Sequence, residues 1–293
     1  MSNLTQKSKG IILMLLSAFF FALMQVMVKL SGGHIPLMEQ VFFRNLVSLF
    51  IVLVIILKDH VSMFGAKKYQ PWLFGRSFFG YLGVICMFYA TNHANQADVS
   101  TLSKMSPFLV TVFAAIFLKE KISKIQVPAT VIAFVGCIVV ANPTFNSNLF
   151  PLFVAFLNAV TSAVAYTLLS YFRGKVDAVT VIMHFSTFSV IASLPFMVMD
   201  FVMPTAYEWM LLLLIGVFAG LGQICLTYAY RMAPAAEVSV YNYSGIVFSM
   251  ILGYVMLGQT LGLNSWIGGA LVIAASLMVY LYNQSKTKAI AQK

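Results

Sequence analysis

Long apolar runs alternate with short polar connectors along the whole chain. Each run lasts about 18–22 residues, the length at which an α-helix crosses a bilayer, whereas a transmembrane β-strand needs only about ten residues of alternating hydrophobicity. Because lipid cannot hydrogen-bond an exposed backbone, we expect helices that satisfy their own backbone groups. The pattern predicts an all-α membrane protein with ten transmembrane helices, at residues 10–30, 38–57, 71–91, 98–117, 125–142, 150–171, 180–199, 208–229, 238–257 and 263–282.

The composition agrees with a lipid environment. Hydrophobic residues make up 61% of the 293 and charged residues only 9%, against about 25% charged in soluble domains. The net charge of +10 does not indicate a nucleic-acid partner, because the basic residues lie in the connectors. Cys86, Cys137 and Cys225 fall inside apolar runs without metal-ligand spacing, so we expect no metal and no cofactor.

The basic residues also predict the orientation. Cytoplasmic connectors of membrane proteins carry an excess of Lys and Arg. If the N-terminus is cytoplasmic, the opposite side holds only Lys29. We therefore expect both termini in the cytoplasm and the protein in the cell (inner) membrane, as a monomer or homodimer. The residues that would face the cytoplasm are Lys7, Lys9, Lys58, Lys67, Lys68, Lys119, Lys121, Lys124, Arg173, Lys175, Arg231, Lys286, Lys288 and Lys293.

An internal repeat relates the two halves. Residues 85–100 align without a gap to residues 224–239, and eight of the sixteen positions are identical. Gly83 and Gly222 extend the match, and Asp98 aligns with Glu237. The chain thus divides into residues 1–143 and 149–285, each with five predicted helices. Since five is odd, the second copy would cross the membrane in the opposite sense, as in transporters that work by alternating access. Duplication retained only for packing is the alternative.

Three ionisable residues lie inside predicted spans: Arg44, Arg76 and Lys104. A charge near the bilayer centre costs at least about 2.5 kcal/mol on insertion scales, so Arg44 should face protein or water rather than lipid. Arg76 is closer to a helix end, where its side chain could reach the interface. No carboxylate lies comparably deep, so a bound anion is the expected partner of the surplus positive charge. The structural alternative for Arg44 is bonding to helix-end carbonyls.

Polar side chains at four-residue spacing accompany these charges, and could line a cavity or join helices. They include Gln40–Arg44–Ser48, Asn158–Ser162–Tyr166 and Gln223–Thr227. Tyr89 lies in the repeated segment, and Tyr243 occupies the repeat position of Lys104. We expect both at the substrate site, although tyrosines near span ends also serve as interfacial anchors. Pro107 should kink its helix, as a gate or as a static bend.

The sequence resembles the drug/metabolite transporter superfamily, in particular its ten-helix members with two EamA-type halves. The likeness covers nearly the whole chain and is carried by the paired repeats and by the sequence FLKEK at residues 117–121. FFRN at 42–45 and GRSFFG at 75–80 are similar to a subgroup associated with carboxylates, amino acids and S-adenosylmethionine. That likeness implies substrate-binding roles for Arg44 and Arg76. Residues 258–260, GQT, depart from the usual Gly/Glu-containing turn.

Together these features predict a secondary transporter, and not an enzyme, that moves a small anionic or carboxylate-bearing metabolite by alternating access. The predicted site residues are Arg44, Arg76, Tyr89, Lys104 and Tyr243. The absence of a deep acid slightly favours facilitated diffusion or exchange over ion coupling. The alternatives are an exporter of hydrophobic or cationic compounds and a scaffold without transport.

Overall fold

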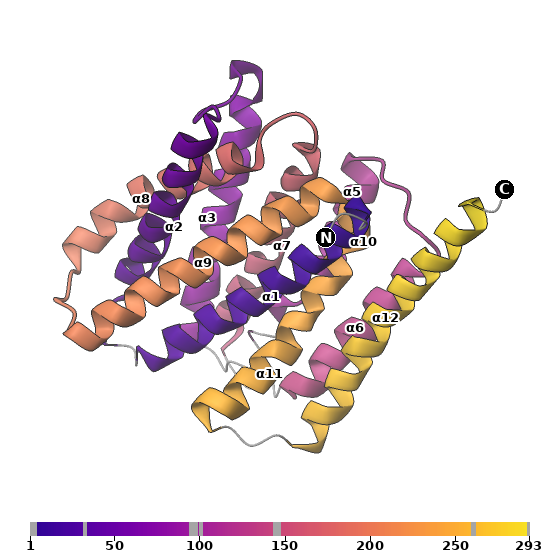
Figure 1. Ribbon diagram of the computed structural model, residues 1–293. Helices are drawn as coiled ribbons and strands as arrows, with labels where there is room; N and C mark the ends of the chain where they lie inside the picture. The colour runs from indigo at the N-terminus through magenta and orange to yellow at the C-terminus, as the bar shows by residue number, and fades with distance from the viewer. Residues whose placement is uncertain are drawn as a thin grey trace.

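A computed structural model describes residues 5–31, 34–93, 99, 102–142, 148–258 and 262–291; at residues 91, 92 and 283–291 the description covers the backbone alone. Helices account for nearly all of the described residues, and no strand occurs among them (Figure 1). The helices are α1 (Gln6–Leu30), α2 (Leu37–Asp59), η1 (Lys67–Tyr69), α3 (Gln70–His93), α5 (Ser106–Phe117), α6 (Gln126–Ala141), α7 (Leu149–Tyr171), α8 (Ala178–Met199), α9 (Ala206–Met232), α10 (Ala235–Val238), η2 (Ser239–Tyr243), α11 (Ser244–Leu257) and α12 (Leu263–Ala291).

The all-α, ten-helix prediction is confirmed, with two of the helices differing in detail. Eight helical stretches of the described chain are long and apolar enough to cross a membrane, and α5 and α6 are shorter apolar helices. The expected helix at 98–117 is interrupted by a turn at Lys104 and Met105, so that α5 begins at Ser106. Pro107 lies in the first turn of α5. A backbone N–H has no acceptor within the helix at this place, so a proline there removes no helical hydrogen bond. The predicted kink is therefore a helix start. Residue Asp98 lies outside the described residues.

The second half shows a related interruption at the equivalent place. Its ninth span consists of α10, the 3₁₀ helix η2 and α11, in direct succession. Tyr243 ends the 3₁₀ segment, and Lys104, its partner in the sequence repeat, lies in the turn before α5. Interrupted helices at membrane depth occur where the backbone is enclosed by protein or lines a cavity.

The helices pack in pairs that reproduce the sequence repeat. Helix α1 packs along α9, as α7 packs along α3; α2 contacts α9, as α8 contacts α3; and α1 contacts α11, as α7 contacts α5. The pairs α2–α8 and α6–α12 each contain one helix from each half and lie at opposite edges of the bundle (Figure 1). Exchanging the halves converts each of the first three pairs into its counterpart and leaves α2–α8 and α6–α12 unchanged. The two halves are thus arranged as two repeats.

Polar contacts at the repeated glycines strengthen this correspondence. Ser17 of α1 donates a hydrogen bond of 2.8 Å to the carbonyl oxygen of Gly222 in α9. Asn158 of α7 donates one, also of 2.8 Å, to the carbonyl oxygen of Gly83 in α3. Both acceptors are positions that the sequence alignment matches. Small residues allow close helix approach, and polar side chains then join the helices.

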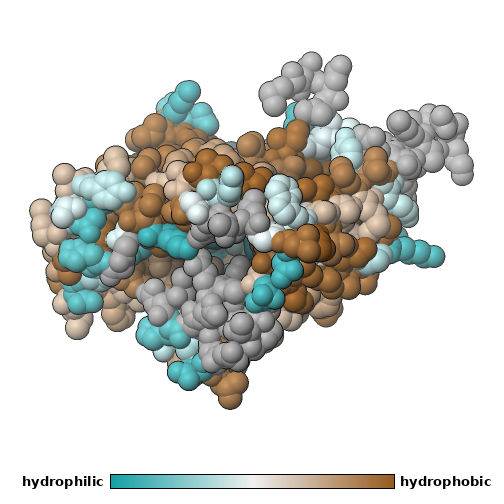
Figure 2. All heavy atoms as spheres, turned by 90° about the horizontal axis from the view of Figure 1, so that it is seen from below, coloured by the Kyte–Doolittle hydropathy of each residue, from teal (hydrophilic) through white to brown (hydrophobic). Residues whose placement is uncertain are grey.

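The outer surface of the bundle is suited to lipid. Figure 2 shows hydrophobic side chains over much of the visible face, with hydrophilic residues scattered among them. On α2, Phe50, Val54 and Leu57 are each more than half exposed. Exposed apolar surface on this scale would be unfavourable in water, and in a bilayer it contacts acyl chains.

Glu120, within the FLKEK segment, joins three helices at one end of the bundle. Its Oε1 accepts a hydrogen bond of 3.0 Å from Ser170 Oγ of α7 and lies 3.5 Å from Arg173 Nη2. Its Oε2 accepts one of 3.2 Å from the backbone N–H of Ala236 at the start of α10. Only 9% of the Glu120 side chain is exposed, so these contacts replace most of its hydration. The sequence analysis gave this residue no such role.

A substitution at Gly216 of α9 tests whether the close contact between α2 and α9 requires glycine at this position. A Cβ at this position would lie 2.4 Å from Cβ of Val47, which sits on the opposing helix and has little freedom to move. We expect Gly216→Ala to lower the free energy of unfolding by about 1–3 kcal/mol, as over-packing does in other cores. Denaturation of the detergent-solubilised protein measures this change.

Gly75→Ala is the matched control, because a Cβ there would lie 3.8 Å from Leu168, an ordinary contact. It should be neutral or slightly stabilising, since alanine favours a helix interior more than glycine does. Equal stability of the two variants would show that the α2–α9 approach is not constrained by Gly216.

Candidate substrate-binding site

Arg44 and Arg76 are brought together inside the bundle. Arg44 lies about 10 Å from the start of α2 and Arg76 about 9 Å from the start of α3, measured along the helix axes. Their exposed fractions are 6% and 1%, so neither arginine faces lipid. Both guanidinium groups lie within electrostatic range of Tyr166 of α7, and Arg76 lies within electrostatic range of Arg44. We call Arg44, Arg76 and Tyr166 the arginine site.

The protein groups around Arg76 hold its guanidinium group without neutralising it. Its Cζ lies 4.0 Å from the ring centroid of Phe185 in α8, a cation–π contact. A Cβ at Gly80 would approach Arg76 Nη1 to 2.7 Å, so the glycine leaves the space that the side chain fills. Nε and Nη1 of Arg76 are buried and have no hydrogen-bond partner. Next to Arg76, Ser77 Oγ and His184 Nδ1 are 2.8 Å apart and link α3 to α8.

Arg44 is held in a similar way, by a neutral neighbour. Its Nη1 donates a hydrogen bond of 3.1 Å to Oδ1 of Asn45, and the Asn45 amide donates one of 2.8 Å to the Val41 carbonyl oxygen. The Nε of Arg44 is buried without a partner. Within the described part of the chain, no carboxylate forms an ion pair with Arg44 or Arg76. The described residues thus leave two buried positive charges without an ion-paired carboxylate.

Tyr166 is the residue of the arginine site that the sequence analysis did not select. Its ring stacks on Tyr230 of α9, with the centroids 5.7 Å apart and the planes at 24°. Tyr230 is fully buried and its hydroxyl has no hydrogen-bond partner. The signal in the sequence was the Asn158–Ser162–Tyr166 spacing, which marks one face of a helix without saying which helix that face meets.

Lys104 and Tyr243 meet at a second place. Both interact electrostatically with the Cys137 thiol of α6. A Cβ built at Gly245 in α11 would lie 3.2 Å from Lys104 Nζ, so the ammonium group reaches this helix. Tyr243 is fully buried. Gly245 is two residues after Tyr243, so Lys104 reaches the part of the chain that carries Tyr243.

Tyr89 lies apart from the other predicted residues. It stacks on His93 with the ring centroids 4.2 Å apart and packs edge-on against Phe150. Thirteen positions separate it from Arg76 on the same helix, which corresponds to about 20 Å along the axis. One small carboxylate group cannot contact both residues, and a substrate contact of Tyr89 stays a prediction.

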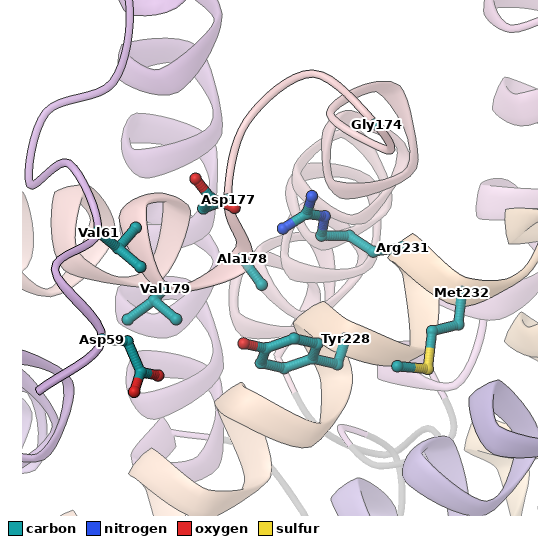
Figure 3. A pocket seen from close by; sticks show the side chains of 9 residues that line it. All are labelled: Asp59, Val61, Gly174, Asp177, Ala178, Val179, Tyr228, Arg231 and Met232. Atoms are coloured by element: carbon teal, nitrogen blue, oxygen red, sulfur yellow. The ribbon is translucent and has the colours of Figure 1, made fainter. Parts of the chain in front are cut away.

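A cavity of about 340 Å³ opens at one end of the bundle and contains none of the five predicted residues. It lies between the end of α2, the turn before α8 and the end of α9, as Figure 3 shows. Its polar lining consists of Asp59, Asp177, Tyr228 and Arg231. Asp59 and Asp177 are exposed, so these charges are in contact with water.

Eight long apolar helices among the described residues, a lipid-compatible surface and buried unpaired cations define a multi-pass membrane protein. Comparison with known proteins identifies the family: the EamA-like transporter family model matches residues 8–142 and 149–281. The chain belongs to this family and is a membrane transporter rather than an enzyme.

Among its relatives is the pseudopaline exporter CntI of Pseudomonas aeruginosa, 31% identical over 270 residues that cover 92% of this chain and 94% of the relative. A riboflavin transporter of Brucella anthropi is 26% identical over 276 residues, covering 90% and 95% of the two chains. A solved crystal structure superimposes with a TM-score of 0.82 at 17% identity, covering 95% of this chain and 98% of the other, which supports the fold alone.

The contact between Arg76 and Phe185 can be measured by a double-mutant cycle. We expect Arg76→Met and Phe185→Leu to show a coupling free energy of about 1–2 kcal/mol, because a desolvated cation–π contact is worth about this much. The measurement is unfolding of the purified single and double variants in detergent.

Phe188→Leu serves as the control in the same cycle. Phe188 packs on Phe74 and Tyr81, so its effect should add to that of Arg76→Met. If the effects of Phe185→Leu and Arg76→Met on unfolding were also additive, the Phe185 ring would contribute nothing specific to holding Arg76.

Proposed function

We propose that this transporter moves a small anionic, carboxylate-bearing metabolite, and that Arg44 and Arg76 bind its carboxylate. The observation that carries this proposal is the pair of buried guanidinium groups, within electrostatic range of each other, with no ion-paired carboxylate among the described residues. An anion would supply the missing acceptors, and a carboxylate fits the planar fork of arginine with two parallel hydrogen bonds.

A cationic substrate fits this site poorly. A cation near Arg44 and Arg76 would meet two like charges in a region of low dielectric, where repulsion is several times stronger than in water. The alternative, export of hydrophobic or cationic compounds, therefore requires a binding place away from both arginines. The name of the 31%-identical relative, an exporter, supports export as the direction.

We further propose alternating access between two inverted repeats, residues 1–143 and 149–285, with both termini in the cytoplasm. The exchange symmetry of the helix pairs and the odd number of helices per half support the inverted arrangement. The one-sided distribution of Lys and Arg supports the orientation. By this orientation the 340 Å³ cavity opens to the cytoplasm.

Uniport or exchange fits the acidic residues better than coupling to protons or sodium. Every described Asp and Glu lies in a connector, at a helix cap or in a terminal turn. Ion-coupled transporters commonly carry ionisable acids deep within their helices. The substrate would then move down its own gradient or against a counter-substrate.

Arg44→Gln tests the proposed site. We expect the variant to move carboxylates at least about tenfold more slowly under subsaturating conditions, because a hydrogen bond to a charged group is worth about 1.5–3 kcal/mol. The assay is flux into proteoliposomes of radiolabelled succinate, glutamate and S-adenosylmethionine, with tetraphenylphosphonium as the cationic comparison.

Lys58→Gln is the control, since it makes the same charge change at the exposed end of the same helix. Its flux should equal that of the unaltered protein. Transport of tetraphenylphosphonium without any carboxylate, or carboxylate flux unaffected by Arg44→Gln, would contradict the proposal.

A further inference from the structure

Lys104 forms a second positive centre, distinct from the arginine site. Lys104 lies in the turn before α5, whereas Arg44 and Arg76 lie in α2 and α3 and are held by Asn45 and Phe185. Its ammonium group is directed at Gly245 of α11. The ion pairs of the described chain do not include Lys104. A bound anion at the arginine site would leave this charge uncompensated.

Residues of both centres belong to, or pack against, the same buried hydrophobic cluster. Cys137, Tyr230 and Tyr243 belong to a single buried cluster, and Tyr166 packs against it. Tyr166 belongs to the arginine site, and Cys137 and Tyr243 are the neighbours of Lys104. A ligand that contacted both centres would therefore lie against this cluster.

The unpaired polar groups at both centres can all donate hydrogen bonds. Nε of Arg44, Nε and Nη1 of Arg76, and the hydroxyls of Tyr230 and Tyr243 are buried without a hydrogen-bond partner. Guanidinium groups only donate, and tyrosine hydroxyls can donate. Buried donors without acceptors are unfavourable, so the complementary ligand is rich in acceptors. Each ionised carboxylate offers about four acceptor positions.

We propose that the substrate is a polycarboxylate, with one carboxylate bound by Arg44 and Arg76 and a second bound by Lys104 and Tyr243. This inference rests on the proposed function and narrows its substrate class. A monocarboxylate satisfies one centre only. A simple amino acid would place its ammonium group, close to its carboxylate, beside the two arginines.

The test compares dicarboxylates with their half-esters, which keep the length and lose one charge. Succinate, glutarate, adipate and pimelate are titrated with the purified protein at constant ionic strength, each beside its monomethyl ester, and the apparent melting temperature is followed. A ligand that binds the folded state raises this temperature. We expect at least one diacid to act at about a tenfold lower concentration than its half-ester, because the half-ester lacks one charge-assisted bond.

Lys104→Met should abolish the difference between that diacid and its half-ester, and Lys104→Arg should retain most of it. The Arg variant controls for folding, and Lys58→Met controls for loss of a lysine elsewhere. Equal effects of diacid and half-ester on the unaltered protein, or an undiminished difference in Lys104→Met, would overturn the polycarboxylate inference.

The two proposals fail in different ways. If half-esters and diacids stabilise the protein equally and Arg44→Gln abolishes both effects, the carboxylate transporter stands and the second centre does not. If neither series stabilises the protein and proteoliposomes carry none of the three labelled metabolites, both proposals are wrong.

Discussion

The placement of positive charge inside a bundle surrounded by lipid constrains the rest of this structure. A guanidinium group that faced acyl chains at the depth of Arg44 would cost at least about 2.5 kcal/mol on insertion scales. Nearby carboxylates would lower that cost and would also occupy the groups that an anion needs. The protein instead surrounds its arginines with neutral partners: the Asn45 amide, the Phe185 ring and the Tyr166 phenol. These contacts hold the charges in position while several N–H donors stay unpaired.

The two halves share a scaffold and differ in chemistry. The interior cations Arg44, Arg76 and Lys104 all belong to the first half. The tyrosines beside them, Tyr166, Tyr230 and Tyr243, all belong to the second. At the repeat spacing of 139 residues, Arg76 corresponds to the buried Ile215 and Lys104 to Tyr243. A ligand held between charge from one half and hydroxyls from the other contacts both repeats, so relative motion of the repeats would change its surroundings.

Local chemistry made part of the site predictable. Arg44, Arg76 and Lys104 could be selected because an ionisable residue in an apolar span needs a special reason, and the repeat paired Lys104 with Tyr243. The position of Tyr166 within electrostatic range of the arginines could not be predicted, since it depends on how α7 packs against α3. Glu120 was missed for the same reason, because its partners Ser170 and Ala236 are distant in sequence. The separation of Tyr89 from Arg76 could be calculated from the sequence, because both residues lie on one helix and the rise per residue is fixed.

The ten-helix architecture followed from apolar run lengths, because the bilayer fixes how long a spanning helix must be. In the sequence, the only sign of the helix interruption at Lys104 was Pro107. A proline restricts the backbone before it, but whether the helix bends or begins there depends on the surrounding packing.

The acidic lining of the cavity at the end of α2 conflicts with an anionic substrate only if all charges are given equal weight. Asp59 and Asp177 are exposed, and in water two unit charges 4 Å apart interact by about 1 kcal/mol, less once salt screens them. Arg231 in the same lining offsets part of even this repulsion. At the effective dielectric of a protein the same separation gives about 4 kcal/mol, and the arginine site holds two cations in that environment. The buried cations therefore outweigh the exposed acids in their interaction with an anion.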